Sequence, residues 1–86
     1  MARVKGKAKR MISAIVILLR NTTWKCGRVE RLAVDYLRRQ FRFRGRVRIP
    51  IKEMLQHFKL DGKQKSEFLD AMKRLERRQI IRIINI

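Results

Sequence analysis

Positive charge is the most informative feature of this sequence, because it indicates what kind of partner the folded domain needs. Of its 86 residues, 24 are Lys or Arg and only seven are Asp or Glu, a formal net charge of +17. A compact domain with this charge repels itself, which favours an anionic partner. Nucleic acid is the commonest such partner, because neutralising its phosphates releases condensed counterions. An acidic membrane surface or an acidic protein would meet the same need.

The length and the apolar content indicate one small domain with a real core. Apolar residues make up 45% of the chain, more than a disordered basic tail would contain. The single cysteine, Cys26, can form no internal disulfide, which suits a reducing cytoplasm, and we expect it to be a partly buried apolar residue. The apolar run Met11–Leu19 is shorter than the roughly 20 residues that span a membrane. A basic start before this run resembles a signal peptide, but no small-residue cleavage site follows. We therefore assign the run to the core. We expect the protein to be cytoplasmic and nucleoid-associated.

The charge is concentrated in the first half of the chain. Residues 1–48 hold 15 Lys or Arg and two acids, a net +13, whereas residues 49–86 carry a net +4. We expect residues 1–7 to form a flexible basic arm and residues 8–86 to form a single domain. The arm and the residues after it can follow a phosphate backbone, and the candidate contacts there are Lys5, Lys7, Lys9 and Arg10.

Hydrophobic periodicity predicts most of the elements. Residues 8–20 fit either a helix or a buried strand, and helix is narrowly favoured because the segment is long. A helix is expected over residues 28–40, with a buried stripe of Val29, Leu32, Ala33, Tyr36 and Leu37. Residues 41–49 alternate apolar residues with Arg, which predicts a strand interrupted by a turn at Gly45.

The second half reads as a short helix, a turn, a longer helix and a strand. Pro50 can end a strand and open a helix, whose apolar face is Ile51, Met54, Leu55 and Phe58. A turn over residues 59–62 leads to a helix over residues 63–78, with Asp61 as its N-cap. The buried stripe of this helix is predicted to be Phe68, Met72, Leu75 and Gln79. Residues 80–86 read as a strand.

This order of elements resembles a winged helix-turn-helix domain. The resemblance covers residues 28–86, and Leu75 and Glu76 occupy the place of a Leu-Glu pair that precedes a strand in that family. It implies a mainly α fold with a small β-sheet, in which the wing is truncated because the chain ends at Ile86. It also implies that the helix over residues 63–78 docks in the major groove.

The helix over residues 63–78 offers one set of candidate nucleic-acid contacts. Its expected outer face contains Lys63, Ser66, Asp70, Lys73, Arg74 and Arg77. Its N-terminal end is the better candidate, because backbone N–H groups also point outward there. The residues that we select are Lys63, Lys65, Ser66, Lys73 and Arg77. An ordinary solvated face of mixed charge is the competing interpretation.

A denser cluster of cations lies between the two halves of the chain. Six arginines fall within eleven residues that contain no acid: Arg38, Arg39, Arg42, Arg44, Arg46 and Arg48. Guanidinium groups grip phosphate in a bidentate manner, so we predict that several of these residues contact nucleic acid. Phe41 and Phe43 lie among them and either stack on bases or belong to the core.

The sequence does not favour an enzyme. His57 is the single histidine and reads as a helix-surface residue, and no acid–base pair, metal-ligand cluster or glycine-rich phosphate loop accompanies it. We therefore expect no metal, no cofactor and no small-molecule substrate. Trp24 is expected to cover the core, with base stacking or partner binding as the alternative.

The favoured function is sequence-independent binding of nucleic acid, with DNA preferred to RNA, by an accessory subunit of a nucleoprotein complex. In size and charge the chain resembles a small basic subunit of the archaeal B-family DNA polymerase holoenzyme. Its ten isoleucines beside many Arg and Lys suit a thermophilic archaeon. The alternatives are a sequence-specific winged-helix regulator, a ribosomal protein resembling the S-twenty-five-e group, and a protein-only adaptor that docks through residues 11–19.

Overall fold

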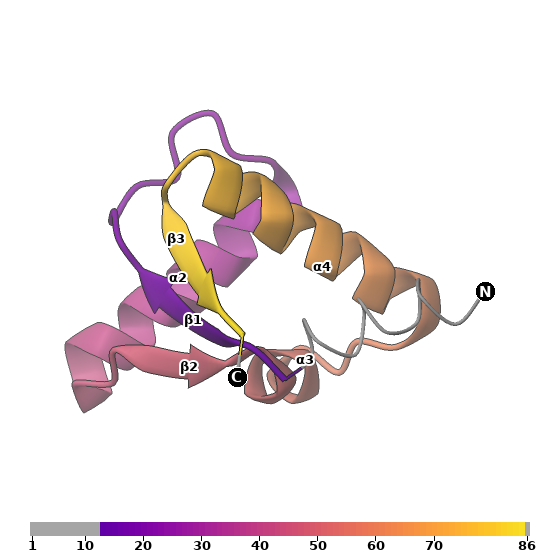
Figure 1. Cartoon of the computed structure of the whole chain (residues 1–86), viewed down its shortest axis with the longest axis horizontal. Helices are drawn as coiled ribbons and strands as arrows, with labels where there is room; N and C mark the ends of the chain where they lie inside the picture. Colours follow the sequence, from indigo (N-terminus) through magenta and orange to yellow (C-terminus); the bar gives the residue numbers. More distant parts are fainter. Residues whose placement is uncertain (1–12, 86) are drawn as a thin grey trace.

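The computed structural model describes residues 13–85, which fold as three helices and a small antiparallel sheet (Figure 1). The expected class, mainly α with a small β-sheet, is confirmed. The basic arm and its candidates Lys5, Lys7, Lys9 and Arg10 lie outside the described residues. In chain order the elements are β1 (Ile15–Leu18), α2 (Arg28–Arg44), β2 (Arg48–Pro50), α3 (Ile51–His57), α4 (Gly62–Arg77) and β3 (Ile81–Ile84).

The helix expected over residues 8–20 is wrong where the structure can be compared, because β1 is the central strand of the sheet. The strand order is β2-β1-β3, and both pairings are antiparallel. Val16 is fully buried, whereas Ile15 and Ile17 on either side are only half-buried, as the period of two in a strand requires. The β-branched residues of this segment are compatible with a helix or a strand. Pairing with β2 and β3 on both edges makes it a strand. The same burial excludes Ile15–Leu18 as a free docking helix.

The strand expected over residues 41–44 is also wrong, because these residues are the last turn of α2. The helix ends at Gly45, whose φ of 64° lies in the left-handed region that glycine adopts without steric cost. The amides of Gly45 and Arg46 donate to the carbonyls of Phe41 and Gln40, at 3.0 and 3.1 Å, and so satisfy the last turn. Phe and Arg alternate here because all four side chains are exposed at the end of the helix, and not because alternate residues face a core.

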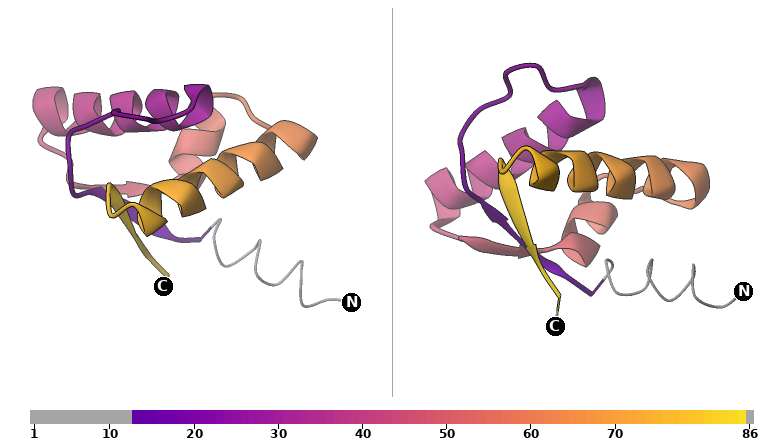
Figure 2. Two further views of the ribbon diagram at one scale, coloured as in Figure 1. Left: turned by 90° about the horizontal axis from the view of Figure 1, so that it is seen from above. Right: turned by 45° about the horizontal axis from the view of Figure 1, so that its top comes forward.

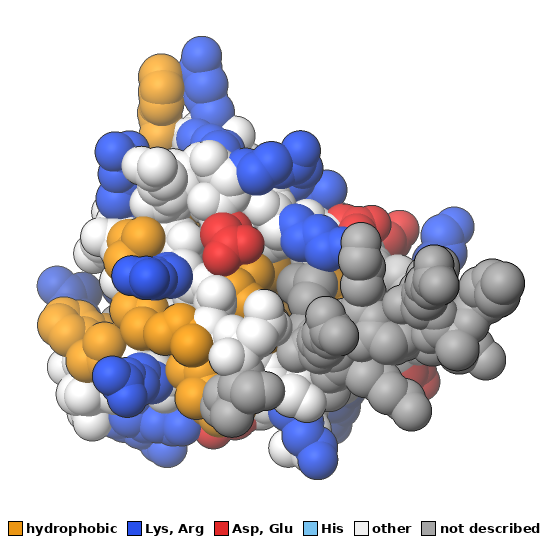
Figure 3. All heavy atoms as spheres, viewed as in Figure 1, with side chains coloured by type: hydrophobic (Ala, Val, Ile, Leu, Met, Phe, Trp, Pro, Cys, Tyr) orange, Lys and Arg blue, Asp and Glu red, His pale blue; other side chains and the backbone are white. Residues whose placement is uncertain are grey.

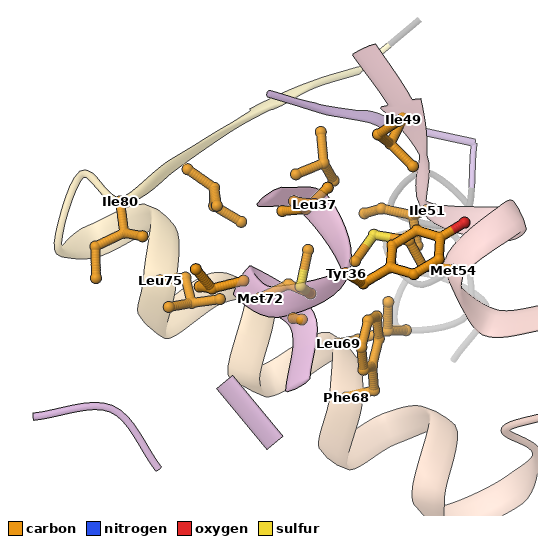
Figure 4. Close-up of a cluster of buried hydrophobic side chains, with 14 of the residues drawn as sticks. Tyr36, Leu37, Ile49, Ile51, Met54, Phe68, Leu69, Met72, Leu75 and Ile80 are labelled. Atoms are coloured by element: carbon orange, nitrogen blue, oxygen red, sulfur yellow. The ribbon is translucent and has the colours of Figure 1, made fainter. Parts of the chain in front are cut away.

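The core lies between the sheet and the helices α2 and α4, which pack against each other and on the sheet (Figure 2). One cluster of buried side chains joins the elements, and Phe68, Met72 and Leu75 of α4 lie at its centre (Figure 4). Leu37 of α2 and Ile49 of β2 complete it from the other elements. Residues 13–85 therefore share one hydrophobic core.

Three residues that were expected in the core are exposed instead. Leu32 is 49% exposed because the packed face of α2 turns toward Val34, which is fully buried. Gln79 follows α4 in a left-handed conformation and begins the turn into β3. Trp24 is 70% exposed in the loop between β1 and α2, with the Lys25 ammonium 4.7 Å from its ring centre. Cys26, by contrast, is buried as expected.

The segment from Pro50 to β3 follows the prediction closely. Pro50 occupies the N-cap position of α3, where its fixed φ is −64°. Ile51, Met54 and Leu55 are buried, and Phe58 packs against the core. Asp61 occupies the N-cap position of α4, but its carboxylate makes no capping hydrogen bond.

Candidate nucleic-acid interface

The six clustered arginines lie at the C-terminal end of α2 and on the chain that leads into β2. Arg38, Arg39, Arg42 and Arg44 belong to the helix, Arg46 follows Gly45, and Arg48 begins β2. Arg39, Arg42, Arg44 and Arg48 are exposed. Helix geometry, rather than a strand, therefore spreads these cations around the end of α2.

Two carboxylates pair with part of this cluster. Asp35 forms an ion pair with Arg38, and its other oxygen is 4.0 Å from Arg39. Glu53 of α3 pairs with Arg46. Arg42, Arg44 and Arg48 have no carboxylate within 4.0 Å among residues 13–85. These three guanidinium groups are the members of the cluster without an ion pair, although the charge of Arg44 reaches Glu53 and lowers the pKa of its carboxyl.

Arg46 has a structural role that the sequence did not reveal. Its two terminal nitrogens donate to the two carboxylate oxygens of Glu53, at 2.6 and 2.8 Å. The Tyr36 hydroxyl donates to Glu53 at 2.9 Å, and Arg46 also donates to Gln40 at 3.2 Å. The network joins α2, the loop after it and α3. It therefore holds together the part of the backbone that carries the other arginines.

The same contacts shift three pKa values, and the hydrogen bond to Glu53 raises that of the Arg46 guanidinium. The hydrogen bonds from Arg46, and to a smaller extent the one from Tyr36, lower the pKa of the Glu53 carboxyl, although partial burial opposes them. Burial raises the pKa of the Tyr36 phenol, and its hydrogen bond to Glu53 raises it further. Glu53 is thus held as a carboxylate at neutral pH.

Replacing Glu53 by Gln should reduce stability by about 1 kcal/mol at pH 7, since the pair is partly exposed. The pKa of Glu53 is lowered on folding, so the stabilisation is complete above the unfolded pKa of about 4.3 and is lost as the pH falls through the folded pKa. Urea titrations of both proteins at pH 7 and pH 3 measure the difference. The matched control is Glu67→Gln, an exposed carboxylate of α4. A difference as large at pH 3 as at pH 7 would contradict this assignment.

The outer face of α4 is exposed as expected, but its charge is mixed. Lys63, Ser66, Lys73 and Arg77 point to solvent, whereas Lys65 is half-buried. The expected face also contains Asp70 and Arg74, with Glu67 beside them, and all three are exposed. The Arg74 Nε lies 3.7 Å from Oε1 of Glu30. The same oxygen accepts a hydrogen bond from the Gly27 amide. This face offers cations to a phosphate backbone, but less densely than the end of α2.

The sheet pairing brings together two arginines that are distant in the sequence. Ile17 is opposite Arg48 on one side and opposite Arg82 on the other. Both arginines are exposed, and residues in one cross-strand row share a face. Sequence reasoning missed Arg82, because only the position of β1 between β2 and β3 connects it to the cluster.

Hydrophobic side chains are exposed beside these cations. Phe41 and Phe43 are 58% and 75% exposed, so the interpretation of both as core residues is wrong. Val47, in the loop before β2, is 50% exposed. Figure 3 shows hydrophobic and basic side chains gathered side by side over the strands and the end of α2, at the lower left of the view. A partner at this surface would meet aromatic and apolar groups as well as charge.

The part of the chain that the structure describes contains neither a metal-ligand group nor a membrane-spanning helix. No group of three or more His, Cys, Asp or Glu side chains in residues 13–85 could hold a metal ion. His57 packs against the Tyr36 ring, with the ring centres 4.4 Å apart. No helix within this range is long and apolar enough to cross a membrane.

Comparison with protein-family models, with curated proteins and with solved structures finds no match to this chain.

Proposed function

We propose that this protein is a small non-enzymatic nucleic-acid-binding protein that grips the phosphate backbone with little regard to sequence. The observation that carries the proposal is the set of exposed guanidinium groups without a carboxylate partner, Arg42, Arg44 and Arg48. Phosphate contacts position a protein on nucleic acid but carry no direct sequence information. DNA is favoured over RNA because of the helix-turn-helix arrangement of α3 and α4.

The arrangement of elements supports a winged-helix-like ancestry for the fold. From α2 onward the chain runs helix, strand, helix, helix, strand, the order of that family. β1, from the N-terminal side of α2, supplies the third strand of the sheet. We propose that α4 is the docking helix and that the end of α2 adds the main contacts to the phosphate backbone.

We also propose a role as an accessory subunit of a larger complex, such as a replicative DNA polymerase. The arginine cluster supplies affinity, whereas the mixed charge of α4 supplies few groups for reading bases. A sequence-specific regulator is the second candidate, since Lys63, Lys65 and Ser66 lie at the start of α4, the end that reads bases in helix-turn-helix proteins.

Affinity purification from the native cell, with and without nuclease, separates these roles. We expect large protein partners in both preparations, because an accessory subunit binds its complex directly. If every co-purifying protein is lost after nuclease treatment, the protein binds only nucleic acid. That result would contradict the accessory role. Selection of one palindromic sequence from a random DNA pool would instead support the regulator.

A further inference from the structure

A hollow of about 280 Å³ lies between the C-terminal half of α2 and the strands β1 and β2. Leu37 and Ile49 form its floor and are buried. Its rim consists of Leu19, Phe41 and Val47, which are 52%, 58% and 50% exposed. Half of the six large hydrophobic side chains that are exposed in residues 13–85 therefore surround this one hollow. Such a concentration of exposed apolar surface marks a binding site more often than scattered single residues do.

The polar groups of the hollow are cationic or neutral. Arg38 and Arg46 line it, and so does the Asn21 amide, whose oxygen accepts from Arg38 at 3.4 Å. None of its lining residues is acidic. Asp35 and Glu53 hold the two guanidinium groups from outside the hollow. These contacts restrict the two guanidinium groups before any ligand arrives, which reduces the entropic cost of ordering them on binding.

This combination suits a flat aromatic ring that is joined to an anionic chain. The Phe41 ring and the guanidinium planes can stack on a ring system, because both offer flat faces. The Asn21 amide can donate to and accept from a base edge. The volume is just below the roughly 300–1,000 Å³ of ordinary small-molecule pockets, so it suits one base.

A second aromatic residue extends the surface around the helix. Phe43 lines an adjacent hollow with Arg39, Arg42 and the carboxylate-bearing Asp35, and Arg38 lines both hollows. Residues two apart on a helix point about 200° away from each other, so Phe41 and Phe43 face different sides of α2. A single strand that crosses the end of α2 would meet one phenyl ring on each side, with guanidinium groups between them for its phosphates.

We propose that the hollow beside Phe41 takes an unpaired nucleobase, so that the protein prefers single-stranded nucleic acid to duplex. The proposal rests on the proposed function and names its substrate class. Stable protein interfaces bury about 1,000 Å² or more, and three rim side chains around so small a hollow provide far less. A stacked base needs only one ring face, and stacking tolerates any base sequence.

The test is a double-mutant cycle that removes the Phe41 ring from the protein and the bases from the nucleic acid. Binding of Phe41→Ala and of the unchanged protein is measured to a single-stranded oligonucleotide, to the same strand with abasic sites, and to the duplex. We expect Phe41→Ala to weaken single-strand binding roughly 5- to 100-fold and to leave duplex binding unchanged. On the abasic strand the two proteins should bind equally. Phe41→Leu, which keeps an apolar side chain but no ring, should resemble Phe41→Ala.

Leu32→Ala is the matched control, since Leu32 is an exposed apolar residue of the same helix outside this hollow. It should change none of the affinities. If Phe41→Ala binds every ligand like the unchanged protein, base insertion is wrong while phosphate binding stands. If the unchanged protein binds no nucleic acid at all, the proposed function itself fails. Loss of a co-purifying protein in Phe41→Ala, without any loss of single-strand affinity, would assign the hollow to a protein and overturn the proposal.

Discussion

Reversing Arg42, Arg44 and Arg48 to Glu is expected to weaken binding to nucleic acid by at least about 100-fold at physiological salt. Each unpaired guanidinium group that neutralises a phosphate releases counterions, and three reversals both remove that gain and add repulsion. The fold should survive, because all three side chains are exposed and no carboxylate in residues 13–85 pairs with them. Fluorescence anisotropy with a labelled oligonucleotide measures the affinity, and circular dichroism verifies the fold.

The matched control reverses three exposed cations elsewhere, Arg28, Arg31 and Lys59. It changes the net charge by the same amount, but at the start of α2 and after α3. We expect a loss of roughly tenfold or less, since beyond a Debye length of about 8 Å exposed charges are largely screened. Equal losses in the two triple variants would mean that net charge alone drives binding and that the end of α2 has no special role.

Val16→Asp should unfold the domain or cost at least about 4 kcal/mol. Val16 is fully buried on the central strand, so an aspartate there would place an unpaired charge in the core. A domain of this kind has roughly 5–15 kcal/mol of total stability, so one such change removes much of it. Chemical denaturation followed by circular dichroism measures the loss.

Ile17→Asp is the neighbouring control and should cost far less, about 1–2 kcal/mol. Ile17 is half-buried on the opposite face, and its cross-strand neighbours are Arg48 and Arg82. An aspartate between two arginines gains about 0.2–1 kcal/mol from each pair, which offsets part of the lost apolar contact. Similar losses for the two substitutions would contradict the assignment of Ile15–Leu18 as a strand with alternating faces.

The segment from Pro50 to β3 could be predicted because each of its signals is local. Pro50 fixes where α3 begins, and the spacing of Phe68, Met72 and Leu75 fixes the buried face of α4. These residues decide their structure within one or two helical turns, so periodicity is sufficient.

Residues 15–18 and 41–44 could not be predicted because their local patterns were compatible with two structures. Ile15–Leu18 becomes a strand only because β2 and β3 pair with it from both sides. Phe41 and Phe43 suggested a half-buried strand, but both rings are exposed, and the cap at Gly45 extends α2 past them. Tertiary context overrides pattern in both cases.

The sequence predicted which residues form the arginine cluster, but not which of them pair with carboxylates. Counting arginines located the cluster at residues 38–48. The pairing of Arg46 with Glu53 depends on how the loop after α2 meets α3, whereas Arg38 and Asp35 pair within one turn of α2. These pairs divide the cluster into cations that hold the structure and cations that remain available to an anion.

The dependence of affinity on salt measures directly how many phosphates the protein neutralises. We predict that the logarithm of the association constant for duplex DNA falls linearly with the logarithm of salt concentration. We also predict that the Arg42, Arg44 and Arg48 reversal makes this slope shallower by about three, because each phosphate contact contributes about 0.9. A slope that is the same in the reversed and the unchanged proteins would contradict the account, since these arginines would then neutralise no phosphates.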